Sequence, residues 1–337
     1  MRKLTAIIAF IAASALFSQT VYASVVHWRV QSNQPQSSAL FQLEQAFADD
    51  VARLTNNQLI IAIRPPEGYV SIRASFSSVR THQIEGMFMN PIYWTSADPI
   101  FAILGDLVTA WDTPEQYYDW LENDNGIQYL EDAYQDYGLR MLGFIISPSE
   151  ALASNVPLRN IADLSGQRIR TPPGMTADYF AALGAFPRQI TLDLAIKAFK
   201  RKQVNIIDFA DIVMNYKGGI YEFAKHTNYP GFHSLPIIDF VVSEQAWQNL
   251  LAEHRQAVLQ AIKRWQVNIE TVYYESLDET LTQLKQQGVT IHNWDAQERL
   301  AARKLAIPVW QKYAKKSPKA QQALNSMMKK LKEIGNL

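Results

Sequence analysis

The chain has 337 residues, of which 48% are hydrophobic, and it contains no cysteine. This hydrophobic fraction supports a large core, and the lack of cysteine excludes disulfides, thiol nucleophiles, iron–sulfur clusters and cysteine-ligated zinc. Basic and acidic residues balance at 32 each, so the overall charge gives no sign of a nucleic-acid partner.

The first residues have the layout of a secretory signal. A basic start over 1–3 precedes an apolar run over 4–16, and Val21–Ala23 then places small residues at both of its ends. The apolar run is shorter than the roughly 20 residues that a membrane-spanning helix needs. We therefore expect residues 1–23 to be cleaved, leaving a mature exported chain that starts near Ser24 and does not insert into the membrane.

The start of the mature chain alternates strand and helix patterns. His27–Val30 alternates like a strand, 37–54 repeats apolar residues at helical spacing, and Leu59–Ile63 is apolar and β-branched. A strand–helix–strand order implies parallel strands, because a parallel pair needs a long crossover connection. Gly86–Met89 is predicted as a further strand of this part.

The α/β pattern recurs after a strand predicted at Leu139–Ile146. We expect short strands at 168–170, 189–190, 204–209 and 236–242, and helices at 176–183 and at 192–202, the latter capped by Thr191. Two α/β lobes without a flexible linker require a chain that crosses between them more than once. Such folds bind ligands in the crevice outside the carboxyl ends of the strands.

The last third of the chain is mostly helical. The segment 245–285 has no Pro or Gly and is predicted to form one long helix, or two in sequence, leaning across both lobes. A short strand at 289–292 and helices at 296–313 and 318–334 complete the predicted elements.

Several motifs, in consistent order and spacing, resemble the DctP family of TRAP solute-binding proteins. They are WRVQS at Trp28–Ser32, IADLSGQRIRTP at Ile161–Pro172, AALGAFP at Ala181–Pro187, IID at Ile206–Asp208, YPGFH at Tyr229–His233 and VSEQAWQNL at Val242–Leu250. The first and fifth are similar to the branch of the family that binds keto and hydroxy acids.

The resemblance implies a periplasmic-binding-protein fold of the α/β class, with two lobes and a long helix spanning both. One lobe would hold 24–147 and 236–275, and the other 148–235 and 276–337, with the ligand cleft between them. The implied function is to capture a small organic monocarboxylate and deliver it to the large and small TRAP membrane subunits.

Arg170 is the leading candidate for a ligand contact. A guanidinium is a planar fork that meets a carboxylate through two parallel hydrogen bonds, and Arg170 ends a predicted strand where a crevice should open. In the family, the arginine at this place grips the ligand carboxylate. A surface ion pair is the alternative interpretation.

Asp211 is the second candidate, as a ligand contact and as the one metal-binding candidate. In the keto-acid branch this place holds Glu followed by Trp, which help to bind a cation that bridges the ligand; here Asp211 is followed by Ile212. A Ca²⁺ or Na⁺ ion would need several further oxygen ligands. A loop acid or a helix cap is the alternative for Asp211, and Asp208 is interpreted as structural.

The remaining candidates are polar and aromatic residues that would line the cleft. Aromatic rings offer rigid apolar surface, and for several of these residues packing or capping is an equally good interpretation. In the first lobe they are Gln31, Asn90, Tyr93 and Trp94, and in the second Phe209, Tyr216 and Phe232.

Two other classes of function compete with TRAP transport. An enzyme is disfavoured because the six histidines are scattered without a metal-binding spacing, and no nucleophile elbow or phosphate loop is present. A periplasmic receptor that serves a sensor or another transporter would share the same pocket. The sequence favours a receptor without a required cofactor.

Overall fold

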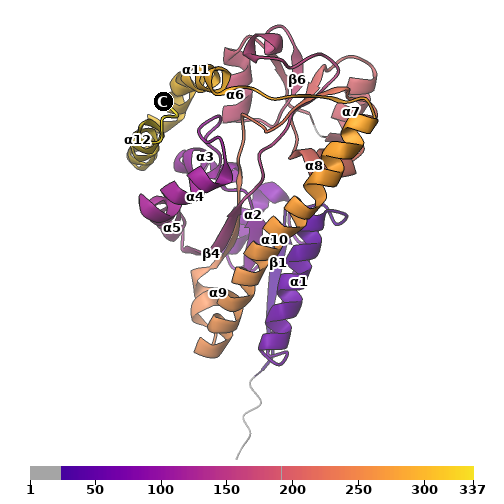
Figure 1. Ribbon diagram of the computed structural model, residues 1–337. Coiled ribbons are helices and arrows are strands. Elements are labelled where there is room, and N and C mark those ends of the chain that lie inside the picture. Colours follow the sequence, from indigo (N-terminus) through magenta and orange to yellow (C-terminus); the bar gives the residue numbers. More distant parts are fainter. Residues whose placement is uncertain (1–23, 191) are drawn as a thin grey trace, which may run out of the picture.

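A computed structural model of the chain describes residues 24–190 and 192–337. The predicted signal and the proposed cap Thr191 lie outside these residues. Two sheets form two lobes, the first in the lower half of Figure 1 and the second above it. None of the described helices is both long and apolar enough to cross a membrane.

The first sheet has the strand order β2-β1-β3-β10-β4. Its strands are β1 (Val26–Ser32), β2 (Leu59–Arg64), β3 (Gly86–Met89), β4 (Leu139–Ile146) and β10 (Ile237–Ser243). β1 pairs in parallel with β2 and β3, as the predicted strand–helix–strand order implied, whereas β10 runs antiparallel to β3 and β4. The carboxyl ends of β1 and β3 therefore meet at the same edge of the sheet.

Helix α1 (Ala39–Leu54) covers this sheet because its apolar residues recur at helical spacing. Its N-terminus is capped by the Ser38 hydroxyl, which accepts a hydrogen bond from the amide of Phe41 at 3.1 Å. Beneath it, Phe88 stacks on Phe240 with ring centroids 4.3 Å apart, and the ring of Phe47 meets both edge-on. This aromatic layer fixes α1 over the sheet.

The second sheet has the order β11-β9-β5-β8-β6-β7 and is built from very short strands. They are β5 (Ala153–Ser154), β6 (Arg168–Arg170), β7 (Phe186–Arg188), β8 (Ile206–Ile207), β9 (His226–Asn228) and β11 (Thr290–His292). The prediction of a strand at 189–190 was wrong, because β7 pairs with β6 three residues earlier and the chain then turns. β8 is also shorter than the 204–209 predicted.

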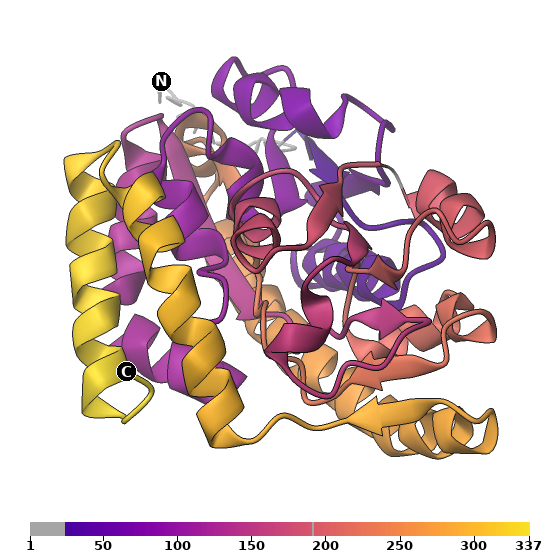
Figure 2. The ribbon, with the colours of Figure 1, turned by 90° about the horizontal axis from the view of Figure 1, so that it is seen from above.

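Shorter helices surround the sheets. They are α2 (Ile72–Arg80), α3 (Ile100–Gly105), α4 (Pro114–Asn123), α5 (Gly126–Gln135), α6 (Met175–Ala182), α7 (Leu192–Lys200), α8 (Ile212–Lys217) and α9 (Glu244–Gln248), with 3-10 turns at Pro91–Trp94, Ile161–Leu164 and Ile220–Glu222. Seen from above, α7 and α8 lie at the second lobe's outer side (Figure 2).

Two extended segments, 147–152 and 228–237, connect the lobes side by side, and we call them the crossing segments. The amide of Ser147 donates to Pro236 O at 2.7 Å, and the amide of Glu150 donates to Ser234 O at 3.0 Å. Gly231 packs directly on this pairing, since a Cβ atom there would lie 1.9 Å from Glu150 O. Only glycine allows the two segments to approach this closely.

Helix α10 (Ala252–Gln286) is a third connection and spans 35 residues. It contacts α1 and β4 in the first lobe and α8 and β11 in the second, and Figure 1 shows it running diagonally between them. The predicted helix over 245–285 is thus two helices, with the long second one leaning across the lobes.

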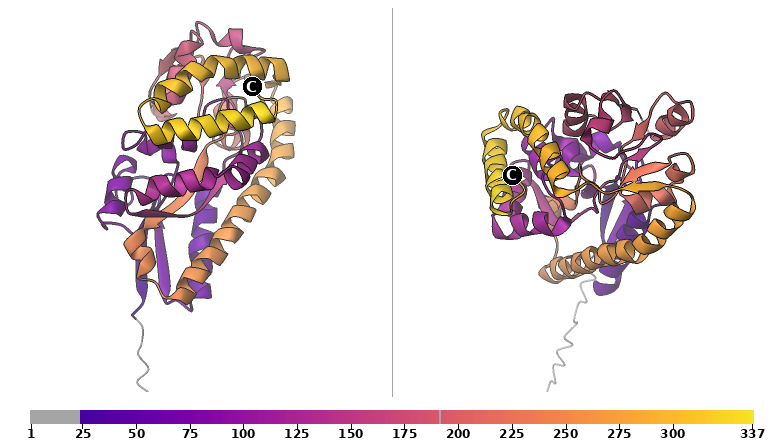
Figure 3. Two further views of the ribbon diagram at one scale, coloured as in Figure 1. Left: turned by 90° about the vertical axis from the view of Figure 1, so that its left-hand side faces the viewer. Right: turned by 45° about the horizontal axis from the view of Figure 1, so that its top comes forward.

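The C-terminal helices α11 (Ala296–Ala314) and α12 (Pro318–Glu333) close one side of the molecule (Figure 3). α11 contacts α3 and α6, and α12 contacts α3 and α5, so the tail packs on elements of both lobes and not only on the second. Arg303, 2% exposed, fixes this arrangement by donating to Thr109 O, Asn336 O and the Asp112 carboxylate at 2.7–2.8 Å.

Candidate functional site

Arg170 ends β6 at the edge of the second sheet where parallel strands finish together. Its Nε donates to Ile190 O at 3.0 Å and its Nη1 donates to Asp208 O at 2.6 Å. The guanidinium carbon lies 5.8 Å from the centroid of the Phe209 ring. Among the described residues Nη2 has no hydrogen-bond partner, so two nitrogens of the guanidinium are held and the third is available.

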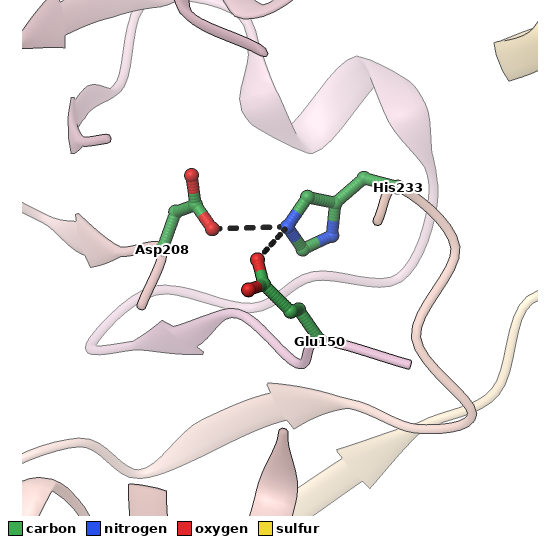
Figure 4. A group of neighbouring side chains, drawn as sticks. All are labelled: Glu150, Asp208 and His233. Carbon is green, nitrogen blue, oxygen red and sulfur yellow. Dashed lines mark hydrogen bonds and ion pairs between the residues drawn. The ribbon is translucent and has the colours of Figure 1, made fainter. Parts of the chain in front are cut away.

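Three ionisable side chains meet beside Arg170: Glu150, Asp208 and His233, which we call the acid–histidine cluster (Figure 4). They come from the first crossing segment, from the end of β8 and from the second crossing segment. His233 Nε2 lies 3.0 Å from Asp208 Oδ1 and 3.7 Å from Glu150 Oε2. The short distance is a hydrogen bond and the long one is not.

The cluster divides charge unequally between its two carboxyl groups. Burial opposes ionisation of Asp208, but His233 and a 2.6 Å hydrogen bond from the Thr171 hydroxyl lower its pKa overall. Burial and the charges of Asp208 and Asp106 raise the pKa of Glu150 well above its usual range. Two neighbouring carboxyls rarely both ionise, so Asp208 carries the charge and Glu150 the proton.

Asp106, in the loop after α3, supports the cluster from the first lobe. Its carboxylate accepts hydrogen bonds from the Ser234 hydroxyl at 2.6 Å and from the Leu235 amide at 3.2 Å. Burial raises its pKa to about 6. The second crossing segment is therefore tied to both lobes at the same point.

Asp211 is the N-cap of α8. One oxygen, Oδ1, accepts from the amides of Val213 at 2.8 Å and Met214 at 3.0 Å. Burial raises the pKa of this carboxyl to about 6, partly offset by these two hydrogen bonds. The helix-cap alternative therefore describes its local contacts.

Asp211 also faces a cavity of about 330 Å³ between the lobes. The cavity lies between the start of α1, α8 and α10, and its lining includes Leu40, Phe209, Asp211, Ile269 and Tyr273. The lining is mostly apolar, so this part of the cleft suits the hydrocarbon portion of a ligand.

The first-lobe candidates differ in their access to the cleft. Tyr93 is 46% exposed, its hydroxyl is close to Asn33, and it interacts electrostatically with Glu150 and Arg170. Asn90 is buried and caps the 3-10 turn by accepting from the Ile92 amide at 2.9 Å. Trp94 is 2% exposed and packs on Phe76 in the core.

Gln31 was a candidate to reach the ligand, with capping or turn formation as the alternative, and its observed contacts are of the second kind. Its side chain is fully buried and joins the end of β1 to the loop after β2. It donates to Ser32 O, Arg64 O and Pro65 O and accepts from the amides of Tyr69 and Val70, at 2.6–3.2 Å. These bonds use the full hydrogen-bonding capacity of the amide.

Two aromatic candidates of the second lobe also lie in apolar packing. Phe232 is 4% exposed and stacks on Trp294 with ring centroids 4.0 Å apart. Tyr216, on α8, is half-buried against the second lobe's core. Phe209 is the one of the three that contacts Arg170.

Sequence reasoning missed Glu150, His233 and Asp106. His233 ends the YPGFH motif and Glu150 follows β4, but nothing local to either residue marks it as part of a cluster. Only the pairing of the two crossing segments brings them together.

Comparison with known proteins decides the family. The model of the DctP family, described as bacterial extracellular solute-binding protein, family 7, matches residues 30–317. The chain belongs to this family. DctP proteins are solute-binding receptors of TRAP transporters and not enzymes, and they work in the periplasm with membrane subunits.

Solved structures of TRAP solute-binding proteins share the fold over nearly the whole chain. An open, ligand-free one from Rhodobacter sphaeroides is 30% identical, with a TM-score of 0.78 over 92% of this chain and 99% of that one. One from Bordetella bronchiseptica, with calcium and picolinate, is 18% identical, with a TM-score of 0.80 over 93% of each chain. One from Pseudoalteromonas atlantica, with sodium and pyruvate, is 18% identical, with a TM-score of 0.79 over 92% and 94%.

Proposed function

We propose that this receptor captures a small organic monocarboxylate, such as a 2-keto or 2-hydroxy acid, through Arg170. The observation that carries the proposal is the half-anchored guanidinium: Ile190 O, Asp208 O and Phe209 fix its orientation while the Nη2 side stays available. A carboxylate there would form charge-assisted hydrogen bonds with a donor already held in place.

The rest of the proposed site comes from both lobes. Tyr93 would face the ligand from the first lobe, and Phe209 would form an apolar wall in the second. Closure of the lobes around the paired crossing segments would exclude water and strengthen the ion pair. No covalent bond changes during capture and release.

The residues at Asp211 do not fit a dedicated Ca²⁺ site. Oδ1 is committed to the α8 cap, so Asp211 offers one oxygen, whereas Ca²⁺ takes six to eight. Calcium and sodium accompany the ligands of two structures of the same fold. For this chain we propose binding through Arg170 without a required ion.

The proposed partners are the large and small TRAP membrane subunits, and the proposed route to the periplasm is export with cleavage after residue 23. Intact-mass measurement of the protein from its host checks the cleavage. A mass that includes residues 1–23 would contradict it.

A thermal-shift screen of small organic acids on the mature protein, with and without Ca²⁺, tests the function. A ligand that binds only the folded state raises the melting temperature. We expect a shift with monocarboxylates that is independent of Ca²⁺, lost in Arg170→Ala and kept in Arg168→Ala, a control on the same strand. No shift with any acid, in protein shown by mass spectrometry to be ligand-free, would contradict the proposal.

A further inference from the structure

We propose that His226 and His292 together bind a divalent transition-metal ion such as Zn²⁺. The sequence shows no metal-binding spacing among its six histidines, and these two are 66 residues apart, so only the fold brings them together. The inference does not depend on the proposed function. The pair lies on β9 and β11, which β5 and β8 separate from β6 and its Arg170.

Two adjacent parallel strands hold the pair at one edge of the second sheet. The register places Thr290 opposite His226 and His292 opposite Asn228, so the two histidines are diagonal neighbours across the strands. Residues two apart along a strand share a face of the sheet, and both histidines therefore project from the same side. Both are half-buried, which leaves them accessible to an ion from solvent.

The facing ring nitrogens are separated by a distance that suits a shared ion. His226 Nδ1 lies 3.2 Å from His292 Nε2, and the two ring planes are inclined by 30°. Zinc binds imidazole nitrogen at about 2.0–2.1 Å, which places two nitrogens of a tetrahedral site about 3.4 Å apart. Without metal, one proton shared between the nitrogens accounts for the observed distance. An ion would replace this proton with only a small movement of the rings.

The surroundings favour neutral imidazoles, the form that binds metal. Burial lowers the pKa of both histidines, and the neighbouring His226 lowers that of His292 further. The other charges that act on His292 are those of Asp163 and Arg159, which are ion-paired with each other at 2.9 Å. On the far side of β9, β5 places the uncharged Ser154 opposite His226. The two imidazoles would therefore decide which metal binds.

A bound ion would fasten α10 to the second lobe. β11 follows α10 after a short turn and is the edge strand of the second sheet, so its pairing with β9 is where this connection joins the sheet. Imidazole ligands suit Zn²⁺, Ni²⁺ and Cu²⁺, whereas Ca²⁺ and Mg²⁺ prefer oxygen. Two protein ligands leave positions for water, so we expect weaker and more reversible binding than at a closed four-ligand zinc site.

Calorimetric titration of Zn²⁺ into the untagged, chelator-stripped mature protein at neutral pH tests the site. We expect saturable binding that weakens at least about tenfold in His226→Ala and in His292→Ala, because losing a ligand costs no less than losing its outer-shell partner. The double variant should bind no more weakly than either single one, since the two rings act as a unit. His27→Ala, at an exposed histidine near the start of the mature chain, is the control and should bind like wild type.

Nuclear magnetic resonance of the imidazole nitrogens supplies a readout on wild-type protein, which does not require any variant to fold. Zn²⁺ should shift the signals of two of the six histidines, with the largest changes at His226 Nδ1 and His292 Nε2. The same addition should raise the melting temperature, because an ion bound only by the folded chain stabilises it. Ca²⁺ should produce neither effect at this pair.

Weakened binding in both histidine variants, together with shifts confined to these two rings, supports the inference. Zn²⁺ binding that persists in both variants overturns it, as does binding that is lost only in Glu150→Gln, which would place the ion at the acid–histidine cluster. A wild-type protein that does not bind Zn²⁺ also overturns it and leaves the pair sharing only a proton. None of these results bears on the capture of an organic acid, which the thermal-shift screen decides separately.

Discussion

The two walls of the cleft place polar side chains at the same structural position, the carboxyl ends of parallel strands, but use them differently. In the first lobe, the side-chain amide of Gln31, at the end of β1, uses all its donors and acceptors on backbone groups. Asn90, after β3, caps a turn. In the second lobe, Arg170 at the end of β6 is anchored through Nε and Nη1, and its Nη2 has no partner among the described residues. We infer that a position at a strand end is not enough for a ligand contact, and that spare hydrogen-bonding capacity is the better guide.

Removing the Arg170 side chain should cause the largest loss of ligand affinity. We expect Arg170→Ala to weaken carboxylate binding by about 2–5 kcal/mol, the range for truncating one partner of a buried charge pair. Arg170→Lys should recover only part of this, because an ammonium cannot keep both backbone anchors and offer a fork as well. Calorimetry checks both, and unchanged affinity in Arg170→Ala would assign recognition elsewhere.

The first lobe also contains a buried glutamic acid with a raised pKa, Glu44 on α1. Burial raises its pKa from 4.5 to about 8, with a smaller opposing effect from Ser32. The protonated Glu44 carboxyl contributes its full share to the free energy of unfolding at a pH below its pKa in the unfolded chain. This contribution is lost as the pH rises through its pKa in the folded protein. We expect Glu44→Gln to stabilise the protein by roughly 2–4 kcal/mol at pH 8 and less at pH 5, measured by denaturant unfolding.

A matched control for Glu44 is available on α10. Glu275 is exposed, so Glu275→Gln should change stability by less than about 0.5 kcal/mol at either pH. If Glu44→Gln behaved like this control, the buried carboxyl would not be the origin of the pH dependence.

Several of the periodic elements predicted from the sequence match the structure closely, whereas α2, α4, α5 and the acid–histidine cluster were not predicted. The strand at 139–146 matches β4 residue for residue, and α11 and α12 begin where predicted. Helix α3 was not predicted, because it is buried on all sides and has no polar face to give a period. Arg170 could be placed at a strand end from local pattern alone, whereas Glu150 and His233 depend on the pairing of two distant segments.

A substitution of Gln31 tests whether this first-lobe side chain stabilises the fold and does not bind the ligand. Gln31→Ala would leave the amides of Tyr69 and Val70 without their acceptor, so we expect a loss of about 1–3 kcal/mol in unfolding free energy. Ligand affinity of the folded protein should stay within about twofold. Gln45, which makes one bond to Ile63 O at 3.2 Å, is the control, and Gln45→Ala should cost much less. A large loss of affinity in Gln31→Ala would return this residue to the ligand site.

Tyr93 is the first-lobe candidate that most resembles Arg170, because it combines exposure with a polar group directed at the proposed site. Tyr93 is 46% exposed, and its hydroxyl interacts electrostatically with Glu150 and Arg170. Deleting only the hydroxyl should therefore leave stability unchanged and weaken ligand binding. We expect Tyr93→Phe to weaken carboxylate binding by about 0.5–1.5 kcal/mol, the net value of one neutral hydrogen bond. Calorimetry at constant pH measures this, with Tyr137→Phe, whose hydroxyl donates to Ala97 O, as the control. If Tyr93→Phe bound normally while Tyr93→Ala did not, the first lobe would supply only shape and the second lobe all of the polar recognition.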